Sequence, residues 1–218
     1  MQLVDRIEKR RFVGREFLLW LWFESEILEA TLSTTEHGPF GLWLEKRLVL
    51  SAGKVSTKIS APSPGLGREA KEALLAGQLP ESAGLRVAWN GDETSVTFKA
   101  EQMALSGLKL QTVLGKEESI QNTLVEDLKP KAKPKQRRGR EAPDEIDESR
   151  EAFYERMHMT QAFEGLIEAL YRDFLDLRLS GSWDESVKPM LRTWAQGGNV
   201  DPERYARVKR PRKGGRSS

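Results

Sequence analysis

The chain has 218 residues, of which 38% are hydrophobic, and it contains no cysteine. This length and composition suit one medium-sized domain or two small ones with a real hydrophobic core. The absence of cysteine excludes disulfide bonds and thiolate chemistry, and it is compatible with a reducing cytoplasm.

The formal net charge of +2 conceals a strong segregation of charge along the chain. Residues 129–140 (KPKAKPKQRRGR) include seven basic residues and no acidic one, and residues 204–218 include another seven without an acid. The remaining sequence therefore has a net charge of about −12. We expect an acidic folded body whose basic charge sits on flexible segments that can grip a polyanion.

The most unusual segment is a run of seven large apolar residues, FLLWLWF at positions 17–23. The run is too short for a membrane-spanning helix, which needs about 20 apolar residues. Its Leu and Trp residues, with the helix formers that follow, predict a helix over about 14–30 that is buried on most sides. Core packing is the preferred interpretation and a binding face is the alternative. A turn over residues 33–41 should close this element.

After that turn, apolar and polar residues alternate, which is typical of strands. A short helix is expected over residues 68–76. A hairpin should turn at Asn90-Gly91, because this dipeptide tolerates the positive φ angles of a type I′ turn, and a last strand over 105–110 should bulge at Gly107. An earlier hairpin is predicted by the alternation of Leu42, Leu44, Leu48, Leu50, Val55, Thr57 and Ile59.

Residues 115–143 lose apolar periodicity and gain Lys, Pro and Gln, which predicts a linker. A long helix should follow from Asp144, and Ser182-Trp183-Asp184-Glu185 resembles a capping box for a last helix, which Pro189 should kink or delay. Packing inside the chain is the preferred role of the apolar stripe on the long helix, with self-association as a coiled coil as the alternative. The stripe consists of Ile146, Phe153, Phe163, Ile167, Leu170, Phe174 and Leu177.

These elements define an α+β fold, in which an antiparallel sheet of hairpins packs with a buried N-terminal helix and a C-terminal helical hairpin follows. The expected organisation is an α+β domain over 1–114, a basic flexible linker over 115–143, a long helix with a short capping helix over 144–197, and a disordered basic tail over 198–218.

The sequence shows no catalytic signature. Glu155 and His158 have the spacing of a di-iron helix bundle, but the second such helix that this site needs has no counterpart. The GLG sequence at 65–67 lacks the spacing of a phosphate-binding loop and is interpreted as a turn. We therefore expect a protein that is not an enzyme, with no catalytic residue, no metal, no cofactor and no small-molecule substrate.

The two basic segments are the best candidates for a functional site. Their side chains would release counterions from phosphates, which gives affinity without reading bases. A scaffold protein whose long helix pairs with itself is the competing hypothesis, and an enzyme with an unrecognised carboxylate site is a third. The residues expected to contact nucleic acid are Lys129, Lys131, Lys133, Lys135, Arg137, Arg138, Arg140, Lys209, Arg210, Arg212 and Lys213.

The segment FVGREFLLWLWFESE at 12–26 resembles a motif of divergent members of the recombination-associated RdgC family. Residues 77–85 and 153–194 are similar to the C-terminal part of such chains, and the resemblance covers the C-terminal half to two-thirds of a family member. It implies a non-enzymatic α+β protein of the bacterial nucleoid that binds DNA without sequence specificity as a ring-shaped dimer and restrains recombinase filaments.

We therefore expect a cytoplasmic, nucleoid-associated homodimer that binds single- or double-stranded DNA. The acidic body shifts the expected DNA contacts to the linker and the tail. No membrane association is expected, because the N-terminus lacks the pattern of a signal peptide and no apolar run reaches spanning length.

Overall fold

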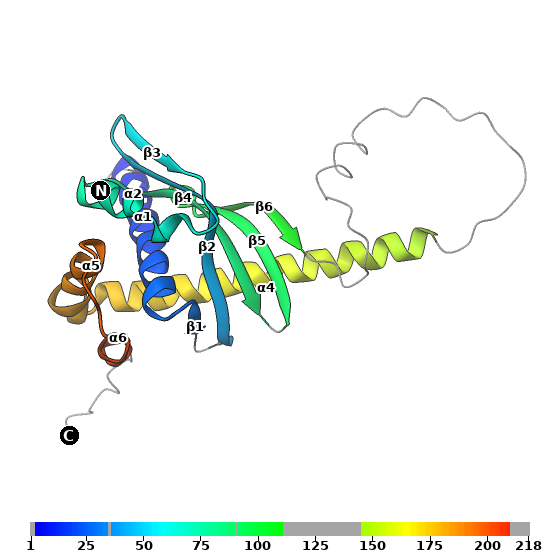
Figure 1. The fold of residues 1–218 in the computed structure, drawn as a ribbon. Helices are drawn as coiled ribbons and strands as arrows, with labels where there is room; N and C mark the ends of the chain where they lie inside the picture. Colours follow the sequence, from blue (N-terminus) through cyan, green and yellow to red (C-terminus); the bar gives the residue numbers. More distant parts are fainter. Residues whose placement is uncertain (1–2, 35, 90, 111–144, 210–218) are drawn as a thin grey trace, which may run out of the picture.

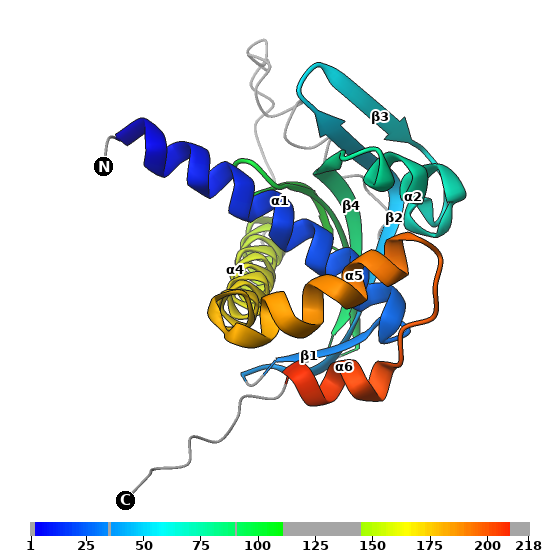
Figure 2. The ribbon, with the colours of Figure 1, turned by 90° about the vertical axis from the view of Figure 1, so that its left-hand side faces the viewer.

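The computed structural model describes residues 3–34, 36–89, 91–110 and 145–209. These residues form a six-stranded antiparallel sheet with α1, α4 and α5 on one side of it (Figures 1 and 2), so the predicted α+β class is confirmed. The elements are α1 Leu3–Ile27, β1 Thr31–Thr34, β2 Gly38–Ala52, β3 Val55–Ile59, η1 Pro64–Leu66, α2 Arg68–Leu75, β4 Leu79–Trp89, β5 Asp92–Lys99, β6 Ala104–Leu110, α4 Glu145–Leu179, η2 Trp183–Val187, α5 Lys188–Ala195 and α6 Pro202–Lys209.

The sheet has the order β1-β2-β4-β5-β6, and β3 also pairs with β2. The predicted hairpins form β2–β3 and β4–β5, and Gly91 has the positive φ angle, 91°, that the tight turn requires. The predicted bulge is also confirmed, because the pairing shifts between Thr97↔Ser106 and Ser95↔Lys109, around a Gly107 with φ of 65°.

The prediction of a simple turn over residues 33–41 is wrong. Residues 31–34 form the strand β1, which pairs with the first residues of β2, and every second side chain of β1 is buried. The preceding helix also begins before the expected residue 14 and ends earlier, because Glu29 and Ala30 adopt left-handed backbone with φ of 48° and 61°. This break turns the chain from α1 directly into the sheet.

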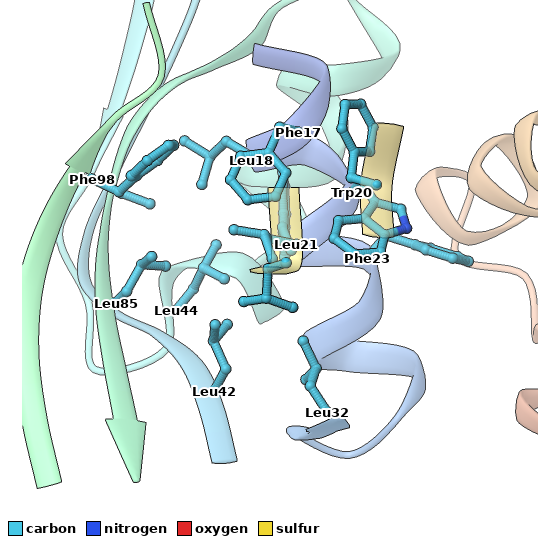
Figure 3. Close-up of a cluster of buried hydrophobic side chains, with 14 of the residues drawn as sticks. Phe17, Leu18, Trp20, Leu21, Phe23, Leu32, Leu42, Leu44, Leu85 and Phe98 are labelled. Atoms are coloured by element: carbon cyan, nitrogen blue, oxygen red, sulfur yellow. The ribbon is translucent and has the colours of Figure 1, made fainter. Parts of the chain in front are cut away.

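The apolar run of α1 is the centre of the hydrophobic core, which confirms its predicted burial. Leu21 faces the sheet residues Leu42 and Leu85, whereas Trp20 and Phe23 point towards the C-terminal helices (Figure 3). Apart from the partly buried Leu19, every side chain of the run is fully buried. A helix that is apolar around its circumference needs such cover on all sides.

The stripe on α4 packs inside the chain over its C-terminal half, as the preferred interpretation expects. Phe174 lies 5.5 Å from both Phe17 and Trp20, measured between ring centroids. The buried residues of this half are Phe163, Leu166, Ile167, Leu170, Phe174 and Leu177. The side chains of Ile146 and Phe153 lie outside the described part of the chain.

Two expectations for the C-terminal region need correction. Ser182 has helical backbone angles and makes no capping hydrogen bond, so the predicted capping box is wrong; the chain continues from it into a π-helical turn, η2, before α5 begins at Lys188. Pro189 lies in the first turn of α5, directly after η2. Residues 202–209 form α6, so that part of the tail is not disordered. The expected linker, 115–143, falls outside the described residues.

A close approach between α1 and the end of β5 gives a test of the packing. A Cβ atom on Gly14 would lie 2.0 Å from the carbonyl oxygen of Ala100, so Gly14→Ala should lower the free energy of unfolding by about 1–3 kcal/mol. The matched control is Gly181→Ala, because Gly181 has open space around it and alanine favours the helix there. Urea denaturation measures both, and an unchanged midpoint for Gly14→Ala would contradict this packing.

Candidate nucleic-acid interface

A buried hydrogen-bond network anchors α6 to α1. The Tyr205 hydroxyl accepts a hydrogen bond from Trp20 Nε1 at 2.8 Å and donates one to Glu24 Oε1 at 2.6 Å. Lys209 Nζ lies 2.9 Å from the other carboxylate oxygen of Glu24 and 5.1 Å from the Trp20 ring centroid. Glu24 and Tyr205 have no exposed surface. The network therefore satisfies each of its buried polar atoms through residues about 180 positions apart.

The charge state of this network follows from its burial. Burial raises the pKa of Glu24, while the Lys209 ammonium and the Tyr205 hydroxyl oppose that rise. Burial and the adjacent Glu24 carboxylate raise the pKa of Tyr205 well above its ordinary value, so the hydroxyl keeps its proton. A buried carboxylate that lost either partner would be left with a large desolvation cost.

The same helix α6 presents basic side chains on its opposite side. Tyr205 and Lys209 point into the network, whereas Arg204 and Arg207 are exposed. Of the predicted contact residues, Lys209 alone falls within the described ranges, and its ammonium pairs with Glu24. We therefore assign Lys209 to anchoring the helix, with Arg204 and Arg207 as the cations that α6 offers to solvent.

A second network, two residues further along α1, joins α1 to α2 and α5. Glu26 accepts hydrogen bonds from Trp22 Nε1 at 2.5 Å, Trp194 Nε1 at 2.7 Å and Lys71 Nζ at 2.8 Å. The Lys71 ammonium also lies 3.1 Å from the Trp194 ring centroid. Burial lowers the pKa of Lys71 to about 8, although Glu26 opposes this shift.

A groove lies along the edge of β2, between its pairing with β1 and its pairing with β3. This Trp43 groove has a volume of about 610 Å³ and adjoins a smaller hollow of about 240 Å³ that also contacts Trp22 and Glu26. Its main lining residues are Trp43, Glu45, Lys46, Pro62, Ser63 and Arg86. The two hollows are neighbours, because Trp43, Leu44 and Ser63 line both.

The charged side chains of the Trp43 groove contact one another. Arg86 lies opposite Trp43 in the β2–β4 pairing, with its guanidinium carbon 4.5 Å from the indole centroid. Burial alone would raise the pKa of Glu45, but hydrogen bonds from Lys46 and Ser95 outweigh it and lower this pKa. Glu45 is thus an ionised carboxylate held next to Lys46 and Arg86.

The structure leaves most of the predicted contact residues undescribed. Lys129, Lys131, Lys133, Lys135, Arg137, Arg138 and Arg140 fall within 111–144, and Arg210, Arg212 and Lys213 follow the last described residue. The attachment points of the segments are described: β6 ends and α4 begins at one end of the molecule, and α6 lies at the other (Figure 1).

The histidine with the di-iron spacing, His158, is exposed on α4, and the side chain of Glu155 is not among those described. Within the described ranges, no group of three or more His, Asp and Glu side chains is arranged to hold a metal ion. None of the described helices is both long and apolar enough to span a bilayer.

The two Trp–Glu networks and the Trp43 groove were not predicted from the sequence. A signal for the networks was present, because Trp20 and Glu24, like Trp22 and Glu26, are four residues apart and share one side of a helix. Trp43 also stands out as an aromatic residue between the inward-facing Leu42 and Leu44 of an alternating strand.

The chain was compared with protein-family models, with curated proteins and with solved structures, and none of the three comparisons found a match. The resemblance to the RdgC family thus stays an interpretation of the motifs in the sequence.

Removing the Tyr205 hydroxyl tests the first network. Tyr205→Phe leaves Trp20 Nε1 without its acceptor and removes one donor to Glu24, so the free energy of unfolding should fall by about 1–3 kcal/mol. Arg207→Ala, an exposed change on the same helix, is the control and should stay within about 0.5 kcal/mol. Equal urea midpoints for the two variants would contradict the anchoring role.

The lowered pKa of Lys71 predicts how stability depends on pH. Between about pH 8 and 10.5 the unfolded chain binds more protons at this lysine than the folded chain does, so this group's contribution to stability rises with pH. The difference in free energy of unfolding between the wild-type protein and Lys71→Met should therefore change in favour of the wild-type protein as the pH rises from about 8 to 10.5. Urea denaturation of both proteins at a series of pH values measures this difference, and a constant or falling difference would contradict it.

Proposed function

We propose that the protein binds DNA without sequence specificity, and that the basic segments 129–140 and 210–213 contact its phosphates. The observation that carries this proposal is the arrangement of α6, which turns Lys209 inward to Glu24 and leaves Arg204 and Arg207 exposed immediately before the basic tail. A firmly anchored helix thus continues into a segment rich in Arg and Lys. Such side chains bind the DNA backbone and release counterions.

The charge distribution supports contacts at both ends of the molecule. The linker segment joins β6 to α4 at one end, and the tail follows α6 at the other (Figure 1). The rest of the chain is acidic, which repels DNA and disfavours a broad contact with the body. With the resemblance to the RdgC family, this supports a nucleoid protein that acts in recombination and works as a homodimer, which we include in the proposal.

A salt titration with two variants tests the proposal. One variant has glutamine in place of the seven basic residues of 129–140, and the other ends after Lys209, so that α6 and its network are kept. Six phosphate contacts predict a loss of roughly a thousandfold in affinity of the wild-type protein for random duplex DNA over a fourfold rise in salt. Combining the two changes should weaken binding at low salt and flatten this dependence.

The matched control is a chain in which the order of residues 129–140 is shuffled. Because the contacts are electrostatic, its affinity and salt dependence should equal those of the wild-type protein. An affinity and a salt dependence that are unchanged in the combined variant would show that the basic segments do not bind DNA.

A further inference from the structure

The Trp43 groove contains an indole ring whose position is fixed by its neighbours. The benzo ring of Trp43 fills the space above Gly41, where a Cβ atom would lie 2.3 Å from a ring carbon. The Arg86 guanidinium contacts the same indole, 4.5 Å from the ring centroid to the guanidinium carbon. Glycine at position 41 and the contact with Arg86 therefore fix the indole in a groove whose volume, about 610 Å³, lies in the range of ligand sites.

The groove also offers polar donors that its own residues do not fully use. Arg86 Nε is buried without a hydrogen-bond partner, 3.8 Å from the Glu45 carboxylate. Lys46 projects from a bulge in β2 with an unusual positive φ of 61°, and its side chain is 68% exposed. Glu45 and Glu93 balance the formal charges of Lys46 and Arg86, which they contact. An anionic ligand here would thus gain more from stacking on Trp43 than from net charge.

We infer that the Trp43 groove holds a nucleobase of single-stranded nucleic acid, stacked on Trp43, with a neighbouring phosphate at Lys46 and Arg86. Bases of single strands stack on aromatic side chains of sheets, whereas bases inside a duplex are covered by their neighbours. This inference rests on the proposed binding of nucleic acid and adds a second kind of contact. The basic segments would hold any DNA, and the groove would favour unpaired strands.

The test compares a short oligothymidylate with an abasic oligodeoxynucleotide of the same length, which carries the same phosphates without bases. The full-length protein should bind the oligothymidylate about tenfold or more tightly, the effect expected of a stacked base. Trp43→Ala should remove this preference, while Trp43→Phe should retain part of it. Lys46→Ala should weaken binding of both strands equally, and Lys54→Ala, an exposed lysine at the β2–β3 turn, is its charge-matched control.

The outcomes separate this inference from the proposed function. Glutamine substitution of the basic segments should weaken binding of both strands and of duplex DNA, yet leave the preference for bases intact. Equal affinity of the wild-type protein for the two strands, or a preference that survives in Trp43→Ala, would overturn the base site whatever the basic segments do.

A second measurement needs no variant and so does not depend on how Trp43→Ala folds. Irradiation of the wild-type protein with an iodouracil-substituted oligonucleotide should form a covalent bond to an aromatic side chain that contacts the base. Mass spectrometry of the digested product should place this bond at Trp43. Attachment found only outside the groove would overturn the inference.

Discussion

The structure depends on how two carboxylates at the end of an apolar helix find their partners. Glu24 follows directly on the Trp-rich run of α1 and is fully buried, and the side chain of Glu26, two residues further on, is 17% exposed. Where water is excluded, as at Glu24, an unpaired carboxylate is very costly. Their partners come from α2, α5 and α6. The need to satisfy these two groups therefore selects one arrangement of the C-terminal helices, whereas apolar packing alone would tolerate several.

Local sequence signals were enough to predict the elements that form within one stretch of chain. The turn at Gly91 and the bulge at Gly107 require backbone that glycine adopts readily, so both could be recognised without knowing the fold. The strand β1 and the helix α6 could not, because each is stabilised by a partner elsewhere: the start of β2 in one case and Glu24 in the other. The capping box at Ser182 was also predicted wrongly, because the backbone is already helical there and no cap is needed.

The candidate sites differ in the same way: the basic segments could be predicted from the sequence, and the Trp43 groove could not. Basic segments are visible in the sequence because charge is a property of each residue, and long-range electrostatics needs no defined geometry. The Trp43 groove was not visible, because it depends on pairing Trp43 with Arg86 and on a loop that closes over β2. Lys209 was counted among the DNA contacts on charge alone, and only its distance to Glu24 reveals its other role.

The great sequence separation within the Tyr205 network has a consequence for synthesis of the chain. Trp20 and Tyr205, whose hydroxyl accepts its hydrogen bond, are 185 residues apart. At ordinary translation rates the ribosome needs about 10–40 s to extend the chain from one to the other. Throughout that interval α1 lacks α6, whose Tyr205 contacts both Trp20 and Phe23 in the finished fold. The nascent protein thus carries its most apolar helix incompletely covered until residue 209 is made, and an interval of this kind calls for chaperones.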